Sequence, residues 1–219
     1  LATKISYINE LANLCEKIGV NIQDISVGMG LDQRIGDRFL RAGPAYGGSC
    51  FPKDTRALID VANKYKIDLS IVKNVVKSNN QRKIILTKRI DKILKNRLKN
   101  KNITFLGVTF KPNTDDMREA SSIPMINYLN KKGSKIRYYD PSGRKKEFDK
   151  LKNVKFYSSI SSACIKSDLI IIHTEWNAFK LLDFKRLVKK KNFKVFDMRN
   201  IYSQDKMRDL KIDYTSIGR

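Results

Sequence analysis

Residues 43–54 read Gly-Pro-Ala-Tyr-Gly-Gly-Ser-Cys-Phe-Pro-Lys-Asp and place a cysteine close to two glycines, a lysine and a carboxylate. Cysteine attacks carbon as the thiolate, which a nearby cation or a helix N-terminus favours. Lys53 and a helix predicted to begin at Asp54 provide both. The glycines let backbone approach a ligand closely. The pattern predicts nucleophilic chemistry at Cys50, and the alternative is a small buried core residue, the commonest role of a free cysteine.

The two other cysteines are interpreted as core residues. Cys15 shares helical spacing with Ile8 and Ile18, and Cys164 lies among the small residues of a short predicted helix. Three cysteines do not form a disulfide framework in a chain of 219 residues, and free thiols favour a reducing, cytoplasmic setting. His173, the only histidine, follows an apolar strand and is interpreted as a packed strand end. With one histidine and no cluster of ligands, the sequence predicts no metal site.

The chain is strongly basic, with 45 Lys plus Arg against 22 Asp plus Glu and a formal charge of +23. Such a charge makes nucleic acid a candidate partner. The lysines are spread along the whole chain, however, and only residues 144–146 and 189–191 form short clusters. A solvated lysine-rich surface is therefore the preferred interpretation. The longest apolar run, residues 169–172, is too short to span a membrane, so we expect no membrane partner.

The pattern of residues 1–98 predicts an all-helical module. Apolar side chains repeat at three-and-four spacing through residues 2–18, with Asn9 on the polar side. Asn21 is suited to cap the next helix. A third helix follows the cysteine segment, and a long fourth helix covers residues 71–94. These helices must position the residues around the cysteine.

The rest of the chain, residues 99–219, alternates strands with helices. The predicted strands are the β-rich apolar runs 103–108, 135–141, 169–173 and 194–197. This order predicts a doubly wound α/β domain, in which ligands bind beyond the carboxyl ends of the strands. The first turn carries Gly107 alone in place of a Gly-x-Gly-x-x-Gly dinucleotide fingerprint. Lys111 and Arg118 could meet phosphates there, with an ordinary solvated loop as the alternative.

Three motifs resemble the bacterial UDP-glucose 6-dehydrogenases. They are residues 46–54, 110–119 and 174–176, and the match runs in the same order along essentially the whole chain. The resemblance implies a helical dimerisation module followed by a Rossmann-like UDP-binding domain. It also implies NAD as cofactor, UDP-glucose as substrate and a homodimer formed through the helical module. A dehydrogenase of another nucleotide sugar stays the alternative, although Ser49 and the residues after Cys50 favour UDP-glucose.

The resemblance also implies roles for individual residues. Cys50 would capture an aldehyde intermediate as a thiohemiacetal, and hydride transfer to a second NAD would give a thioester that water hydrolyses to UDP-glucuronate. Asp54 matches the aspartate that activates water, and Lys53 and Arg118 match cofactor contacts. The implied substrate contacts are Phe39, Leu40, Arg41, Ala42, Gly43, Gly47, Phe110, Lys111, Arg199 and, from the neighbouring subunit, Arg34.

Two departures from the family pattern are evident. Ala45 stands where the family usually has glycine. The N-terminal NAD-binding domain and the helix that precedes the first residues in the family have no counterpart in this sequence. The resemblance therefore predicts a fragment of a longer enzyme, and for the chain by itself we expect folding, dimerisation and weak binding of UDP without turnover. A catalytically incomplete UDP-sugar-binding module is the rival hypothesis.

Overall fold

The first helices form where the apolar spacing places them. The computed structural model describes all 219 residues, and its helix α1 spans Ala2–Ile18. Gly19 ends this helix in the left-handed conformation, with φ of 73°. The side chain of Asn21 caps α2 (Ile22–Gly30) by accepting a hydrogen bond from the Gln23 amide.

Helix α3 spans Cys50–Lys64 and so begins four residues earlier than predicted. The proline at position 52 lies in the first turn, where its missing N–H removes no intrahelical hydrogen bond. Helix α4 follows at Ser70–Ile93, and no strand occurs before residue 102. The earlier start of α3 has a direct consequence, because it makes Cys50 the first residue of the helix.

A parallel six-stranded sheet makes up the second half of the chain, in the order β3-β2-β1-β4-β5-β6. The strands are β1 (Asn102–Leu106), β2 (Lys135–Tyr139), β3 (Val154–Phe156), β4 (Leu169–Ile172), β5 (Lys194–Asp197) and β6 (Asp213–Ser216). The helices between them are α5 (Ser122–Lys131), α6 (Ile160–Cys164), α7 (Phe184–Val188) and α8 (Gln204–Asp209). The doubly wound α/β architecture is confirmed, with β3 and β6 in addition to the four predicted strands.

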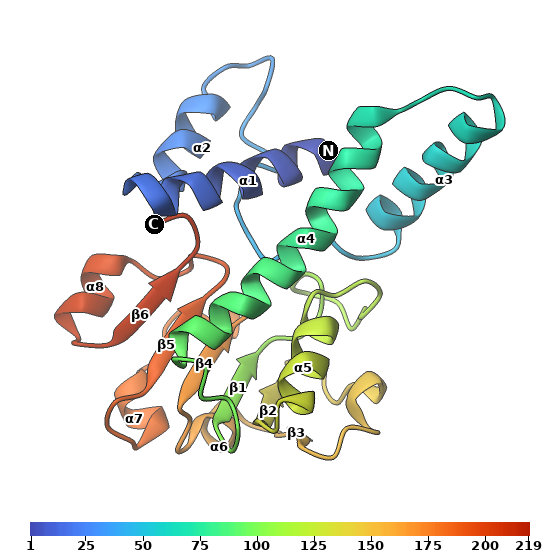
Figure 1. Cartoon of the computed structure of the whole chain (residues 1–219). Coiled ribbons are helices and arrows are strands. Elements are labelled where there is room, and N and C mark those ends of the chain that lie inside the picture. Colours follow the sequence, from blue (N-terminus) through green and yellow to red (C-terminus); the bar gives the residue numbers. More distant parts are fainter.

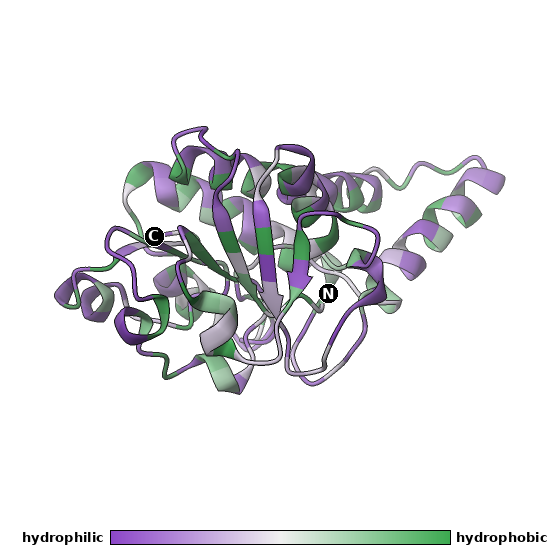
Figure 2. Cartoon of the chain, turned by 90° about the horizontal axis from the view of Figure 1, so that it is seen from below, coloured by the Kyte–Doolittle hydropathy of each residue, from purple (hydrophilic) through white to green (hydrophobic).

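The two faces of the sheet pack into different apolar clusters, and Figure 2 shows helices on both sides of the sheet, with hydrophobic residues along its strands. Along β4, Ile170 and Ile172 face the cluster formed with α6, α7 and α8, whereas Leu169 and Ile171 face the cluster formed with α4 and α5. This alternation follows from the period of two along a strand. The second cluster continues into α1, where it includes Ala12, so one apolar core joins both halves of the chain. None of the helices combines the length and the hydropathy of a membrane-spanning segment.

Two further contacts hold the halves together. Helix α4 packs against α1 and α3 at one end and against α5 at the other (Figure 1). The residues after β6 return to the first helices, where the Gly218 amide donates to Glu16 Oε1 at 2.7 Å and its carbonyl accepts from the Ile22 amide at 2.8 Å. Arg89 of α4 pairs with the same Glu16 carboxylate. The end of the sheet is thus fixed to the helical half.

Candidate active site

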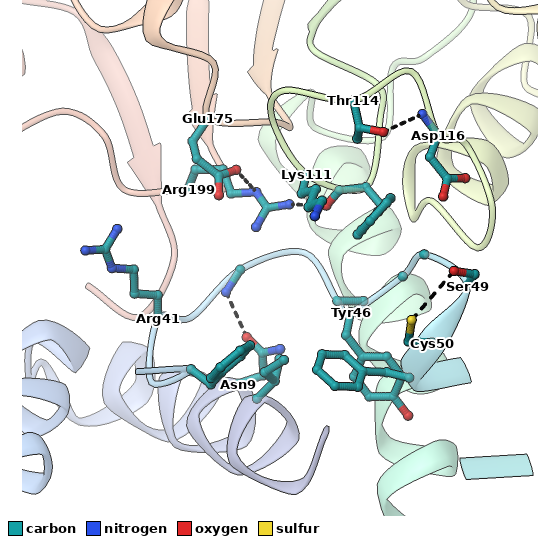
Figure 3. Close-up of a pocket in the computed structure, with 18 residues that line it drawn as sticks. Asn9, Arg41, Tyr46, Ser49, Cys50, Lys111, Thr114, Asp116, Glu175 and Arg199 are labelled. Carbon is teal, nitrogen blue, oxygen red and sulfur yellow. Dashed lines mark hydrogen bonds and ion pairs between the residues drawn. The ribbon is translucent and has the colours of Figure 1, made fainter. Parts of the chain in front are cut away.

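A pocket of about 650 Å³ lies between the helical half and the carboxyl edge of the sheet (Figure 3). The loops after β1, β4 and β5 form one side, and α1 with the segment that leads into α3 forms the other. Strands β1 and β4 are neighbours from which the chain winds in opposite directions. Such a switch point is where open α/β sheets bind ligands, and the pocket has the size of a small-molecule site.

Cys50 lies on the wall of the pocket with its side chain exposed. Its sulfur is 3.7 Å from Ser49 Oγ, and it stands at the N-terminus of α3, the end of a helix that attracts negative charge. Lys53 and Asp54 form an ion pair of 2.7 Å on the next turn, with both side chains mainly in solvent. Neither of them lines the pocket. The nucleophile predicted from the sequence is therefore accessible, and its two charged neighbours lie outside the pocket lining.

Two cations, Lys111 and Arg199, line the sheet side of the pocket, and a third, Arg41, lines the other side in the segment that leads into α3. Arg199 is held firmly, because its Nε donates to the carbonyl of His173 at 2.8 Å and its Nη2 donates to the carbonyl of Phe110 at 3.1 Å. The carboxylate of Glu175 lies 3.0 Å from the same Nε. A planar guanidinium fixed in this way is suited to bind a phosphate.

The supports behind Arg199 are buried. His173 is fully buried, its Nε2 lies 2.8 Å from Ser121 Oγ, and burial lowers its pKa to about 3, so the imidazole is neutral. This confirms the interpretation of His173 as a packed strand end. Asp197, at the end of β5, accepts a hydrogen bond of 2.9 Å from the Arg199 amide, and burial raises the pKa of this carboxyl.

The turn before Cys50 packs against the loop that follows β1. The Gly48 amide donates to the carbonyl of Arg118 at 2.8 Å. A Cβ on Gly47 would lie only 2.7 Å from the Glu119 carbonyl oxygen, and one on Gly48, where φ is 80°, would meet the ring of Phe110. Both positions require glycine, for close approach and for backbone conformation.

The predicted site residues fall into two groups. Those that line the pocket are Phe39, Arg41, Gly43, Gly47, Cys50, Phe110, Lys111 and Arg199. Those that lie outside it are Arg34, Leu40, Ala42, Lys53, Asp54 and Arg118. Leu40 and Ala42 are buried on either side of the exposed Arg41. Arg34 is exposed and forms a forked pair with Asp32. Its Nε donates to Asp32 Oδ1 at 3.0 Å, and its Nη2 lies 2.6 Å from Oδ2.

The turn after β1 does not fit the pyrophosphate of a dinucleotide. The Asp140 carboxylate accepts a hydrogen bond of 2.8 Å from the Val108 amide, which a phosphate would otherwise use. A Cβ on Gly107 would meet Thr174 closely, so this glycine is used for packing.

The predicted cofactor contacts, Lys53 and Arg118, are exposed cations. The hydrogen bond from Arg118 to Asp116 raises the pKa of Arg118. In the same way, Asp54 raises the pKa of Lys53.

Ten residues that line the pocket were not among the predicted site residues. The lining also includes Ile5, Asn9, Ala45, Tyr46, Gly48, Ser49, Phe51, Thr114, Asp116 and Glu175. Most of them belong to the three motifs, so the motifs could have indicated them. Nothing in the sequence indicated Asn9, which was interpreted as a residue of the polar side of α1. It is 3% exposed, and its Oδ1 accepts a hydrogen bond from the Gly43 amide at 2.8 Å.

Comparison with known families agrees with the architecture. Residues 1–81 match the central domain of the UDP-glucose/GDP-mannose dehydrogenase family, and residues 104–204 match the UDP binding domain of the same family. The chain belongs to this family. The matched segments place the cysteine helix in the central domain and the sheet in the UDP binding domain, so the family resemblance of the motifs is confirmed.

Relatives within the family are dehydrogenases of nucleotide sugars. The chain is 44% identical over 221 residues to the UDP-glucose 6-dehydrogenase of Rickettsia typhi and 43% identical over 226 residues to UDP-glucose 6-dehydrogenase YwqF of Bacillus subtilis. All of the chain is covered, and it spans about half the length of these curated relatives, 51% and 50%. A UDP-glucose dehydrogenase structure from Pyrobaculum islandicum superposes with a TM-score of 0.83 at 29% identity, covering 98% of this chain and 47% of its own.

Proposed function

We propose that this chain is the central and UDP-binding part of a UDP-glucose 6-dehydrogenase, which oxidises UDP-glucose to UDP-glucuronate. The observation that carries the proposal is the exposed Cys50 at the N-terminus of α3, on the wall of a pocket whose opposite side bears the cations Lys111 and Arg199. The division into a helical part, residues 1–98, and a nucleotide-binding part, residues 99–219, belongs to the proposal. So does a homodimer formed through the helical part.

The pocket offers a different environment to each end of a nucleotide sugar. Lys111 and Arg199 line it as cations, and a diphosphate between them would gain charge-assisted hydrogen bonds. The ring of Phe110 and the backbone of Gly47 form the adjoining wall. With the diphosphate on the cations, the sugar extends toward Cys50. The remaining contacts are assigned to residues 39–43, and Arg34 is assigned to the site of a neighbouring subunit.

Cys50 is the proposed nucleophile. Its thiolate adds to the carbon of the C6 aldehyde, a C–S bond forms, and the carbonyl oxygen takes a proton to give a thiohemiacetal. NAD, when bound by the full-length protein, supplies the hydride acceptor. Asp54, one helical turn after Cys50, is assigned to activate the water that hydrolyses the thioester. Lys53 and Arg118, whose side chains are exposed, are assigned to contact the cofactor from this chain's side.

A UDP-sugar-binding module without turnover is the second candidate function. One observation favours it for the chain by itself: in the turn after β1 the Val108 amide is occupied by Asp140, and the turn offers no cradle for a dinucleotide. Both candidates share the same pocket and the same substrate. They differ in whether this chain alone reduces NAD in the presence of UDP-glucose.

Calorimetric titration and thiol labelling test the proposal. We expect the chain to bind UDP-glucose more tightly than GDP-mannose, and bound UDP-glucose to slow alkylation of Cys50 by iodoacetamide. A Cys50→Ser variant serves as control, because it loses the labelled site and keeps the cations. Absence of UDP-glucose binding at millimolar concentration, or labelling that bound ligand does not slow, contradicts the proposal.

A further inference from the structure

Beneath the pocket lies a cluster of buried polar side chains to which the proposed function assigns no role. Asn79 of α4 is 4% exposed, and both ends of its amide are used. Its Oδ1 accepts from the Tyr46 amide at 2.9 Å, and its Nδ2 donates to the Tyr46 carbonyl at 3.0 Å. One side chain thus binds both polar backbone groups of a single loop residue, as a neighbouring β-strand would.

The other end of the same loop is held in a similar way. Arg82, one turn further along α4, is 3% exposed, and its Nε donates to the Gly43 carbonyl at 3.1 Å. Asn9 of α1 accepts from the Gly43 amide at 2.8 Å. Burial lowers the pKa of Arg82 to about 10, which leaves it a cation at neutral pH. Residues 43 and 46 are therefore both anchored by helices through buried side chains.

Tyr46 is the anchor closest to the nucleophile. Its ring packs edge-on against Phe51, with 6.0 Å between ring centroids, and Phe51 directly follows Cys50 in α3. The intervening turn has one further attachment, the hydrogen bond from Gly48 to the loop after β1. The turn of residues 46–49 is thus held by α4 at one end and by the loop after β1 in its middle, and it leads directly into α3. Among the polar side chains, only Asn79 binds the Tyr46 backbone.

We propose that Asn79 is a positioning residue whose amide fixes Tyr46 and thereby the turn that presents Cys50 to the pocket. The identity of the ligand in this inference rests on the proposed function. The anchoring of Tyr46 rests on the two hydrogen bonds of Asn79 alone. The role needs an amide, because Tyr46 presents a donor and an acceptor at once. An ionised aspartate accepts but does not donate, and leucine does neither.

Amide exchange and ligand affinity measured on the same variants test the inference. Asn79→Asp removes the donor while keeping the shape, and Asn80→Asp is the matched control, since Asn80 is the next residue of α4 and is exposed. At pH 8 we expect exchange across residues 43–48 to accelerate at least tenfold in Asn79→Asp and UDP-glucose affinity to fall at least fivefold. The control stays within twofold of the wild type in both measurements.

A pH series separates positioning from general loosening. Below the pKa of the introduced carboxyl, its O–H replaces the lost amide donor, so the affinity deficit of Asn79→Asp shrinks toward pH 5. Two charged side chains line the small cavity beside Asn79, Glu10 of α1 and Arg82 of α4. The Asn80→Asp control shows no such recovery. A deficit that is independent of pH points to packing alone and overturns the donor role.

Each remaining outcome also decides the question. If Asn79→Asp matches its control in both exchange and affinity, the inference is wrong. If the wild type does not bind UDP-glucose, the proposed function fails, while the exchange comparison still tests the anchoring of Tyr46. Should Asn79→Asp not fold, Asn79→Leu takes its place, because it keeps the volume without burying a charge. A folded Asn79→Leu with wild-type exchange and affinity overturns the inference.

Discussion

Replacing Gly47 by alanine tests how closely the turn before Cys50 approaches the loop after β1. The new Cβ would lie 2.7 Å from the Glu119 carbonyl oxygen and 3.0 Å from Phe110 Cβ. The first distance is roughly 0.8 Å short of the optimum for non-bonded atoms. Neither neighbour is the end of a flexible side chain, so the two loops must part. Overpacking of this kind costs about 1–3 kcal/mol.

For a chain of this size such a cost lowers Tm by about 2–12 °C. Because both loops line the pocket, we also expect Kd for UDP-glucose to rise at least tenfold, which corresponds to about 1.4 kcal/mol. Differential scanning calorimetry and titration calorimetry measure the two effects. Gly28→Ala is the control: no atom lies within 4 Å of its added Cβ, and alanine in α2 is favoured by about 0.5–1 kcal/mol. A Gly47→Ala protein with wild-type Tm and Kd refutes the reasoning.

Three further predictions concern parts of the chain away from this contact. Burial lowers the pKa of His173 to about 3, below its unfolded value of about 6.5, so the unfolded chain binds the extra proton and stability falls as the pH drops below about 6.5. By pH 5 the free energy of unfolding should have fallen by about 2 kcal/mol. Urea unfolding of His173→Gln should lack this part of the pH dependence, and an equal fall in both proteins would contradict the prediction. Gly218→Ala, at φ of 69° and against the Ile22 side chain, should lower Tm more than Gly47→Ala does, and a smaller decrease counts against the described fit. Iodoacetamide should label Cys50 in the native protein and reach the buried Cys164, whose pKa burial raises to about 12, only after unfolding, as peptide mass spectrometry would show.

Secondary structure could be predicted where one physical signal dominates. The bounds of α1 follow from apolar spacing and a terminal glycine, and β4 follows from four consecutive buried apolar residues. Strands β3 and β6 were missed because Val154–Phe156 and Asp213–Ser216 are short, partly exposed and contain polar residues. They lie at the two edges of the sheet, where one neighbour is missing. Their strand conformation depends on pairing with β2 and β5.

The site was predictable where it is contiguous in sequence. Cys50 and Gly47 come from one motif, and Lys111 comes from another, so the residue types themselves indicated a role. Asn9 and Asn79 are different, because each is a polar residue within a long amphipathic helix and its partner is a backbone group 33 or 34 residues away. Helical periodicity does not distinguish a solvated asparagine from one that faces a buried loop. That distinction requires the tertiary structure.

The apolar core that joins the two halves has a consequence for how the protein unfolds and moves. Ala12 of α1 and Ile90 of α4 belong to the same buried cluster as Ile103 and Phe105 of β1. Melting should therefore be cooperative, with a calorimetric enthalpy equal to the van't Hoff enthalpy for the whole chain. Because a hinge motion between the halves would have to open this core, we expect the halves to move as one body. We therefore expect movement that admits a ligand within residues 109–119, because residues 43–46 are held by buried side chains of α1 and α4.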